Sequence, residues 1–298
     1  MEIRVLRYFL AVAREENISN AAQVLHITQP TLSRQLMDLE EELDTQLFVR
    51  GNRKISLTND GMFFRKRAQE IIDLVDKTES DFLSSEDIVS GDVCIGGGET
   101  NAMSFLMETA KSIQDTHPNI HFHIQSGDAS TITELLDKGL IDFGVLIGPS
   151  DLSKYDYLRL PFNDTWGVLM LKDSPLANNE YIQPSDLWDL PLIASRQPLR
   201  YNELSSWIGK HYENLNIVAT YNLIYNGSKM VESGMGYAIT LDHLISTDEQ
   251  SKFVFRPLYP PLEAGLVIVW KKYQIFSKPA ELFLKQLQNR CYAFNEKH

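Results

Sequence analysis

The 298-residue chain is 43% apolar and 23% charged, which is ordinary for a globular protein and long enough for two or three compact units. No run reaches the roughly 18 apolar residues of a membrane-spanning helix, and the first residues lack the layout of a secretory signal. We therefore expect a cytoplasmic protein without a membrane partner. The two cysteines, Cys94 and Cys291, give neither a disulfide framework nor a CxxC metal pair.

The net charge of −12 argues against a nucleic-acid partner when the chain is taken as a whole. The charge of each segment gives a different result. Residues 1–58 carry seven basic and eight acidic residues, residues 59–88 carry four and eight, and the remainder carries seventeen and twenty-four. Within the first segment the acids gather at residues 15–16 and 38–44, apart from Arg34, Arg50, Arg53 and Lys54. A local basic surface therefore remains, and for nucleic acid it matters more than the total.

Helical spacing of apolar residues predicts a first helix near the amino terminus, at Leu6, Phe9, Leu10 and Ala13. Ser19 is the predicted N-cap of a second helix over residues 20–26. After a break at residues 27–28, Gln29 and Pro30 open a third helix, because proline is tolerated in a first helical turn. The third helix has an apolar stripe at Leu32, Leu36, Leu39 and Leu43. Two helices joined by a tight turn are typical of a helix-turn-helix.

Residues 46–49 and 54–57 are predicted to pair as a β-hairpin whose tip, residues 50–53, makes a wing. Thr58 to Gly61 then cap a long helix that runs to about Asp87. Along this helix a stripe recurs at spacings of four and three, at Phe64, Ala68, Ile71, Val75, Thr78 and Phe82. A heptad stripe of this kind favours pairing with the same helix of a second chain. The alternative is that the stripe packs against its own domain.

A helix that reads DNA buries one face and presents the other to base edges in the major groove. Arg34 lies opposite the leucine stripe and is the best candidate for a bidentate contact to guanine or for a phosphate clamp. The basic residues of the wing should reach the adjacent backbone or the minor groove. The candidate DNA-binding residues are Ser19, Asn20, Thr28, Gln29, Pro30, Thr31, Ser33, Arg34, Gln35, Arg50, Arg53 and Lys54. The alternative is a solvated polar face on a helical domain.

The stretch AAQVLHITQPTLSRQLMDLEEELDTQLFVR, followed by Leu57, Thr58 and Gly61, resembles the signature of LysR-type transcriptional regulators. One departure is Asp44, where these proteins usually have glycine. Because aspartate tolerates the left-handed conformation better than most residues, we expect the helix ending to be kept. The resemblance implies a homodimer or homotetramer that binds double-stranded promoter DNA, responds to a small-molecule effector and has RNA polymerase as a partner.

After Ser90 and Gly91, strands and helices alternate, which predicts an α/β architecture with mostly parallel sheets. The predicted strands lie near residues 92–95, 121–125, 143–146, 166–171, 192–194, 217–221, 237–240 and 265–270, and an amphipathic helix covers 279–292. The resemblance implies an effector domain of two Rossmann-like subdomains, built like a periplasmic binding protein. We thus expect a multidomain protein: a winged helix-turn-helix domain (1–58), a linker helix (59–89), subdomain I (91–161 plus 266–298) and subdomain II (162–265).

Strand ends that open onto such a cleft supply backbone N–H groups and helix N-termini, which favour anions. The first of these, residues 96–101, reads GGGETN and not GxGxxG, so a dinucleotide is not expected. An arginine near the cleft would pair with a carboxylate, so we expect a small organic anion as effector. Thr100 and Asn101 either contact this effector or simply cap a helix. The candidate effector-binding residues are Thr100, Asn101, Ser126, Gly127, Ile147, Ser195, Arg196 and Arg200.

A second hypothesis is an α/β enzyme or a solute-binding protein with an accessory helical domain. The sequence offers no export signal and no convergent nucleophile or acid–base set, so we expect no catalytic residue, no cofactor and no metal. His121 and His123 share one strand face but lack a third ligand for zinc. Cys94 and Cys291 fall in a predicted strand and the final helix, where a buried, apolar-like cysteine is usual. The resemblance implies oxidant sensing only for members with cysteines in the second subdomain, and this sequence has none there, so thiol sensing is not expected.

Overall fold

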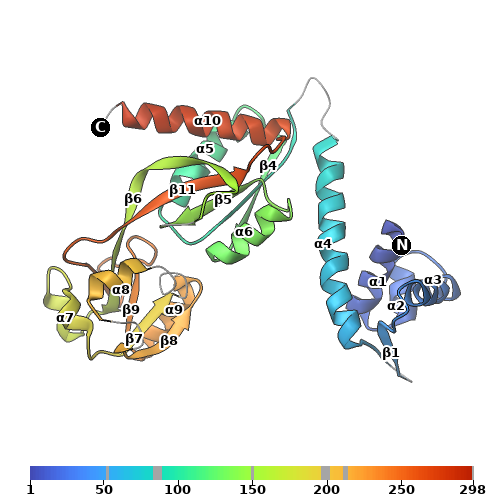
Figure 1. Ribbon diagram of the computed structural model, residues 1–298, viewed down its shortest axis with the longest axis horizontal. Coiled ribbons are helices and arrows are strands. Elements are labelled where there is room, and N and C mark those ends of the chain that lie inside the picture. The colour runs from blue at the N-terminus through green and yellow to red at the C-terminus, as the bar shows by residue number, and fades with distance from the viewer. Residues whose placement is uncertain (52–53, 83–88, 149–150, 196–201, 211–213, 297–298) are drawn as a thin grey trace. The chain divides into compact units, whose positions relative to one another are not determined.

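The computed structural model describes residues 1–298 except 52–53, 83–88, 149–150, 196–201, 211–213 and 297–298. The chain forms two compact units, residues 1–83 and residues 84–298 (Figure 1). Each unit has its own buried apolar core. The first unit therefore contains both the helix-turn-helix and the long helix that follows it.

The first unit consists of helices α1 (Ile3–Glu15), α2 (Ile18–Val24) and α3 (Gln29–Glu42), the hairpin β1 (Phe48–Arg50) with β2 (Ile55–Leu57), and helix α4 (Asn59–Phe82). Phe9 of α1 is fully buried at its centre. The Phe9 ring lies 5.1 Å from that of Phe48 and 4.8 Å from that of Phe64, measured between centroids. One aromatic cluster thus joins α1, the wing and α4, as the sequence-predicted order of elements requires.

The predicted start of α3 at Gln29 is confirmed, and Thr28 is its N-cap. The predicted N-cap of α2 is wrong. Ser19 is not the N-cap of α2: that helix begins at Ile18, and the Asn17 side chain accepts hydrogen bonds from the Ser19 and Asn20 backbone N–H groups at 2.9 and 3.1 Å. Asparagine and serine are both good N-caps, so the local sequence alone does not choose between them.

The leucine stripe of α3 is buried at Leu32, Leu36 and Leu39. Leu43 is the C-cap and is 37% exposed, so the predicted stripe is one residue too long. Asp44 follows with φ of 48°, which is the left-handed conformation expected where aspartate replaces glycine.

Helix α4 begins after Thr58, whose hydroxyl accepts a hydrogen bond from Gly61 N (2.9 Å) and donates one to Gln46 O (2.7 Å). The helix is described as far as Phe82, and its predicted end near Asp87 lies outside the described residues. Its buried residues Ala68 and Ile72 pack into the core of the first unit, with Phe64 beside them.

The amino-terminal half of the predicted heptad stripe therefore packs against its own unit, which is the alternative interpretation. Ile71 of that stripe instead lies 38% exposed. Part of the stripe expected to pair with a second chain is thus buried within its own chain.

The second unit contains one mixed sheet, whose strands among the described residues follow the order β4-β3-β5-β11-β6-β9-β7-β8, with β10 also paired to β6. The strands are β3 (Gly91–Gly97), β4 (Ile120–Ser126), β5 (Phe143–Ile147), β6 (Tyr155–Leu171), β7 (Leu192–Ser195), β8 (Ile217–Tyr221), β9 (Tyr237–Leu241), β10 (Phe253–Pro257) and β11 (Glu263–Lys271). The helices are α5 (Ala102–Gln114), α6 (Ala129–Asp137), α7 (Pro184–Leu187), α8 (Asn202–Ile208), α9 (Ile224–Glu232) and α10 (Lys278–Asn295), with a 3-10 turn at Pro175–Asn178.

The expectation of mostly parallel sheets is wrong for the centre of this sheet. β3 runs parallel to β4 and β5, and β7 runs parallel to β8 and β9. The central strands β6 and β11 are antiparallel to each other, and β5, β9 and β10 are antiparallel to whichever of these two they adjoin. The reason is that β6 and β11 carry the chain between the two halves of the sheet, so both belong to both halves.

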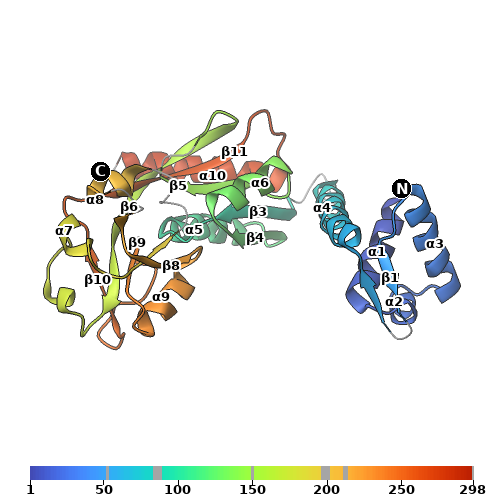
Figure 2. The same cartoon turned by 60° about the horizontal axis from the view of Figure 1, so that its bottom comes forward.

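Helices cover both faces of each half (Figures 1 and 2). Residues of α5 and α10 pack on one face of the β3 half, and those of α6 pack on the other. In the β7 half, α7 and α8 share a core with Trp166 and Ile239, whereas α9 packs with Leu169 and Ile193. Each half is therefore a three-layer α/β structure, in agreement with the predicted pair of Rossmann-like subdomains.

Gly61 allows the first turn of α4 to lie against the wing, because a Cβ at this position would lie 2.1 Å from the carbonyl oxygen of Leu47. We expect Gly61→Ala to lower the free energy of unfolding by about 1–3 kcal/mol, since the backbone must shift to relieve the overlap. Urea denaturation measures the change. Gln69→Ala, an exposed substitution on the same helix, should change the value by less than about 0.5 kcal/mol. Equal effects would contradict the close approach.

Candidate functional site

The amino-terminal half of α3 presents the predicted DNA-reading residues to solvent. Thr28, Gln29, Pro30, Thr31 and Arg34 are exposed, as are Ser19 and Asn20 at the start of α2, and Ser33 and Gln35 are half-buried. The Thr28 hydroxyl lies 2.7 Å from that of Thr31 and accepts a hydrogen bond from Thr31 N at 3.4 Å. The N-terminus of α3 is therefore an ordered, polar surface, with its leucines turned inward.

The cations of this surface differ in their surroundings. Arg34 makes no ion pair with any described residue, so its guanidinium is available to an outside partner. Lys54 on the wing forms an ion pair with Glu16, which follows α1. Arg50 lies in β1, but its side chain, like the whole of Arg53, lies outside the described residues. Arg34 is thus the described basic residue best placed to contact DNA.

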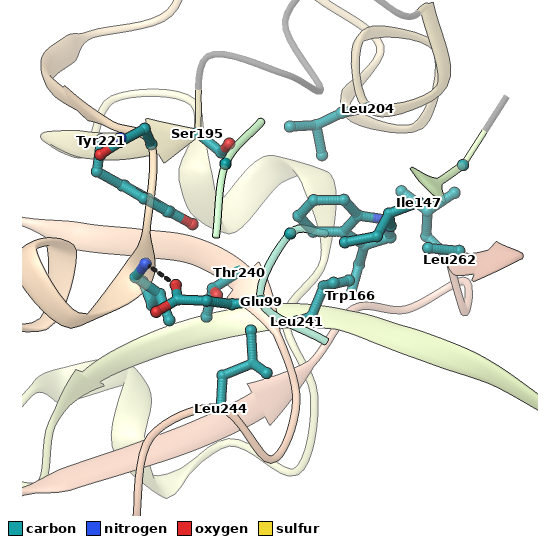
Figure 3. A pocket seen from close by; sticks show the side chains of 16 residues that line it. Glu99, Ile147, Trp166, Ser195, Leu204, Tyr221, Thr240, Leu241, Leu244 and Leu262 are labelled. Carbon is teal, nitrogen blue, oxygen red and sulfur yellow. Dashed lines mark hydrogen bonds between the residues drawn. The ribbon is translucent and has the colours of Figure 1, made fainter. Parts of the chain in front are cut away.

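A pocket lies in the second unit where the two halves of the sheet meet (Figure 3). The space between protein atoms there, counted together with its opening to solvent, is about 720 Å³. The described lining residues come mainly from the carboxyl ends of strands and from the crossing strands: Gly98, Glu99, Gly127, Ile147, Gly148, Trp166, Ser195, Leu204, Tyr221, Asn222, Ile224, Thr240, Leu241, Leu244, Leu262 and Ala264. Ligands of α/β sheets bind at such ends.

Three of the predicted effector-binding residues, Gly127, Ile147 and Ser195, line this pocket. Thr100, Asn101 and Ser126 are not among its lining residues: Thr100 is buried, and the other two are exposed elsewhere. Arg196 and Arg200 lie outside the described residues. At the end of β3 the pocket is lined by Gly98 and Glu99, and the Thr100 hydroxyl accepts from Ala102 N at the start of α5, which fits the capping alternative that the sequence left open.

Thr100 turns away from the pocket because it binds Asp164. Its hydroxyl donates a short hydrogen bond to the buried Asp164 carboxylate and accepts one from Ala102 N at 3.1 Å. The Asn101 backbone also donates to Asp164. The carboxylate of this crossing-strand residue therefore occupies the N-terminus of α5. Burial raises the pKa of Asp164 above its usual range, against the lowering effect of the Thr100 hydrogen bond.

Glu99 makes the corresponding contact on the other side of the pocket. Its Oε2 accepts a short hydrogen bond from Ile224 N, the first residue of α9 (Figure 3). Glu99 belongs to the β3 half and Ile224 to the β7 half, so this contact joins the two halves. Burial raises the pKa of the half-buried Glu99 carboxyl, and the Ile224 hydrogen bond opposes that shift.

Sequence reasoning missed most of the apolar wall. Trp166, Leu204, Leu241, Leu244 and Leu262 carry no motif and look like ordinary core residues in the sequence. Tyr221 and Asn222 follow β8 at a predicted strand end, so the same strand-end principle would have found them if applied there.

The weaker candidates gain no support as metal sites. His123 Nε2 lies 3.1 Å from Asp92 Oδ1 and His121 Nδ1 lies 3.8 Å from it, all exposed or half-exposed. No group of three His, Cys, Asp or Glu residues suited to a metal ion occurs among the residues that the structure describes. Within the same residues, no helix is both long enough and apolar enough to cross a membrane.

A winged helix-turn-helix whose exposed helix carries an arginine that pairs with no described residue, in one chain with a two-halved α/β pocket, defines a ligand-responsive DNA-binding regulator. The family pattern described as "Bacterial regulatory helix-turn-helix protein, lysR family" matches residues 3–62, and "LysR substrate binding domain" matches residues 87–292. The chain belongs to the LysR family: it is a LysR-type DNA-binding transcriptional regulator with an effector-binding domain.

Individual relatives agree with this assignment over nearly the whole chain. The HTH-type transcriptional regulator BsdA of Bacillus subtilis is 29% identical over 301 residues, which cover 95% of this chain and 99% of BsdA. The Hca operon transcriptional activator HcaR of Escherichia coli is 30% identical over 288 residues and 94% of each chain. The fold matches that of full-length CbnR complexed with its target DNA, with a TM-score of 0.76, 17% identity, and 97% and 99% of the two chains covered.

The raised pKa of Asp164 predicts a pH dependence of stability. A carboxyl whose pKa is higher in the folded chain contributes stability that is fully present below its unfolded pKa and is lost as pH rises through the folded pKa. We expect Asp164→Asn, which stays neutral but can still accept from Thr100, to melt above wild type at alkaline pH. The difference should shrink as pH falls toward the unfolded pKa of about 3.9.

Thermal melts across this pH range measure the difference. The neighbours His243 and Asp242 also act on this carboxyl, in opposite directions, and both remain in the variant. Asp156→Asn, at an exposed position of the same strand, is the matched control and should follow wild type. A gap between wild type and Asp164→Asn that is constant with pH would contradict the assignment.

Proposed function

We propose that this regulator binds a dyad-symmetric promoter site as a dimer, assembles further as a dimer of dimers, and changes transcription when a small molecule enters its pocket. The observation that carries the proposal is the exposed, polar amino-terminal half of α3 with the unpaired Arg34. A helix of this kind places short hydrogen-bonding groups and one arginine at the base edges of the major groove. CbnR, which shares the fold and was crystallised in complex with its target DNA, supports the same role.

The dimer contact is proposed to involve the outward face of α4. Three exposed side chains, Phe63, Ile71 and Leu74, share this face and define an exposed stripe. Their exposed fractions are 65%, 38% and 43%, which is unusual for apolar residues on one helix of a soluble domain. Ala68 and Ile72 are already buried within the unit. The contact between chains is therefore proposed to involve the exposed stripe and not the predicted heptad stripe.

Oligomerisation compensates for the near absence of net positive charge in a single DNA-binding domain. The first 58 residues have almost no net charge, and Lys54 is ion-paired, so one reading domain has little non-specific attraction to DNA. Pairing two or four reading domains multiplies a few placed contacts. RNA polymerase, expected as a partner of a transcriptional regulator, belongs to the same proposal.

The pocket is the proposed effector site. It lies where β6 and β11 cross between the proposed subdomains, residues 91–161 plus 266–298 and residues 162–265. A ligand there contacts both halves, and it shifts the assembly only by its difference in affinity for the two arrangements. The small organic anion expected from the sequence depends on Arg196 or Arg200 and stays a prediction. The enzyme alternative is supported by no described constellation, and the named relatives are regulators.

The function is tested by measuring binding of the purified protein to its own upstream DNA at several salt concentrations. A specific shift that weakens steeply with salt, compared with unrelated DNA of equal length, supports it. The absence of any specific shift, with or without small molecules, would overturn it.

Arg34 is expected to supply most of the discrimination between DNA sequences. We expect Arg34→Ala to cost about 1–3 kcal/mol of specific binding, measured against unrelated DNA, with the mass of the oligomer unchanged. Arg34→Lys separates the two roles, since lysine keeps a phosphate contact but loses bidentate pairing with guanine. Arg14→Ala, which removes an exposed arginine paired with Glu15, is the matched control. Retained specificity in Arg34→Ala would show that another face reads the DNA.

Leu74 is expected to hold the dimer together. We expect Leu74→Glu to shift native mass toward the monomer and to weaken DNA binding at least tenfold, because a charge would be buried in an apolar contact. Gln69→Glu adds the same charge to α4 on another face and should leave the mass unchanged. Native mass spectrometry measures both. An unchanged mass for Leu74→Glu would exclude the exposed stripe as the contact.

A further inference from the structure

Two helix N-termini lie beside the pocket, and each is already occupied by a carboxylate of the chain itself. Asp164 accepts from Thr100 and from the Asn101 backbone at the start of α5, and Glu99 accepts from Ile224 N at the start of α9. Helix N-termini are the usual places for a bound anion. Here a carboxylate of the chain itself already accepts from one backbone N–H at each of the two helix starts.

Two hydroxyl groups of the pocket already donate hydrogen bonds within the protein. Tyr221 donates to Ile239 O at 2.7 Å, and the Thr240 hydroxyl donates to the Tyr221 oxygen. Glu99 Oε2 is bound to Ile224 N, but the other oxygen, Oε1, has no partner among the described residues. Glu99 thus offers the pocket a charged hydrogen-bond acceptor that no described residue uses.

The remaining described wall is apolar or uncharged. Trp166 and several leucine and isoleucine side chains line the pocket (Figure 3), and the described lining contains no lysine or arginine. An anionic ligand would therefore bring a second negative charge beside Glu99 in a partly desolvated space, where like charges repel more strongly than in water. A ligand that donates a hydrogen bond would instead supply a partner for the Oε1 oxygen of the Glu99 carboxylate.

We propose that the pocket takes a small apolar molecule bearing a hydrogen-bond donor, preferentially an ammonium group, and that Glu99 accepts from this donor and excludes simple carboxylates. This inference rests on the proposed function of the pocket as the effector site, and it names the chemical class of the effector. It is an alternative to the small organic anion expected from the sequence, which would depend on Arg196 or Arg200, and the two ligand classes are opposite outcomes of one binding experiment.

The electrostatics of Glu99 agree with the geometry. Burial raises the pKa of its carboxyl, which means that the Ile224 hydrogen bond does not fully compensate the buried charge. A bound ammonium would supply the missing compensation and would itself be stabilised by it. Glu99 is thereby a residue that selects among ligands by charge.

The test uses three ring compounds of similar size that differ in one group: benzylamine, benzamide and benzoate. Isothermal titration with the full-length protein at about pH 7.5, where these are respectively a cation, neutral and an anion, measures each affinity. We expect benzylamine to bind at least tenfold more tightly than benzoate, with benzamide between them. Equal or tighter binding of benzoate overturns the proposal, and so does the absence of binding by all three up to about 10 mM.

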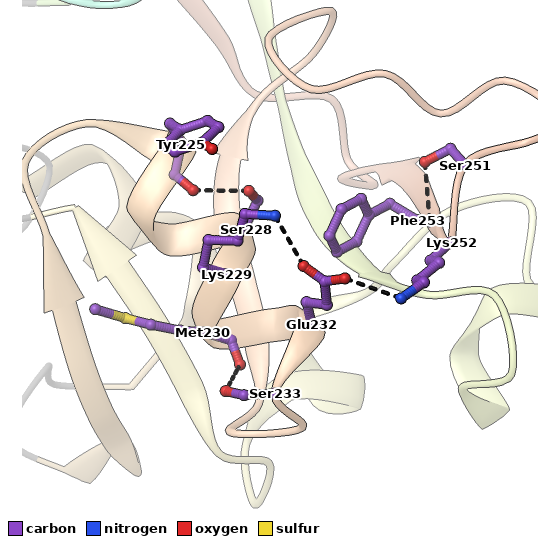
Figure 4. A network of polar contacts seen from close by, with 9 residues as sticks. All are labelled: Tyr225, Ser228, Lys229, Met230, Glu232, Ser233, Ser251, Lys252 and Phe253. Carbon is purple, nitrogen blue, oxygen red and sulfur yellow. Dashed lines mark hydrogen bonds and ion pairs between the residues drawn. The ribbon is translucent and has the colours of Figure 1, made fainter.

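Two variants locate the preference. Glu99→Gln keeps an acceptor for Ile224 N but removes the charge, so the benzylamine-to-benzoate ratio should fall at least tenfold. Glu232→Gln is the matched control on the same helix as Ile224: Glu232 pairs with Lys229 and Lys252 at 2.9 and 3.0 Å in a network away from the pocket lining (Figure 4). Its ratio should equal that of wild type. An unchanged benzylamine-to-benzoate affinity ratio in folded Glu99→Gln overturns the role of Glu99. If this variant fails to fold, the ratio measured for wild type still tests the ligand class.

A second measurement separates this inference from the proposed function. Binding of the upstream DNA is followed with saturating benzylamine and with saturating benzoate. Glu99-dependent benzylamine binding that leaves DNA binding unchanged supports the ligand class and counts against the pocket as effector site. Tight benzoate binding that changes DNA binding supports the effector site and overturns the ligand class.

Discussion

The antiparallel pairing of β6 with β11 is the interaction on which the second unit depends. The two strands stay paired from Tyr155 with Lys271 to Thr165 with Glu263, with one register shift near Gly265. β6 is hydrogen-bonded to β11 and then to β9 and β10, so one strand serves both halves of the sheet. Trp166 and Ala264 of the pocket lie on these crossing strands. The pocket is therefore built on the shared strands, and its walls come from the strand ends of the two halves.

The helix-turn-helix is predictable from sequence almost residue by residue, because its signals are local. Thr28 and Pro30 mark the start of α3, and the leucine spacing marks its buried face. The central sheet is different, since Pro161 and several polar residues hide the first half of β6, and its partner β11 lies about a hundred residues further along. Strand direction there is set by pairing over long sequence separations. The periodicity of apolar residues does not predict such pairing.

The candidate site divides in the same way. Strand ends can be located from sequence, which is why Gly127, Ile147 and Ser195 of the candidate set line the pocket. Which side chain of a strand-end turn points into a pocket depends on partners elsewhere in the chain. The sequence leaves open whether Thr100 contacts a ligand or caps a helix, and in the structure its hydroxyl binds Asp164 of β6 at the start of α5. Glu99 then faces the pocket and meets Ile224, and this arrangement brings together residues from three separate parts of the sequence.

The ion pair between Lys54 and Glu16 has a consequence for how the regulator finds its site in a genome. A transcription factor competes with itself across an enormous excess of wrong sequences, and each unpaired cation raises its residence on all of them alike. A lysine held by a carboxylate adds little to that indiscriminate attraction. Such a protein spends less time on random DNA, and its occupancy depends on the few groups that distinguish one sequence from another.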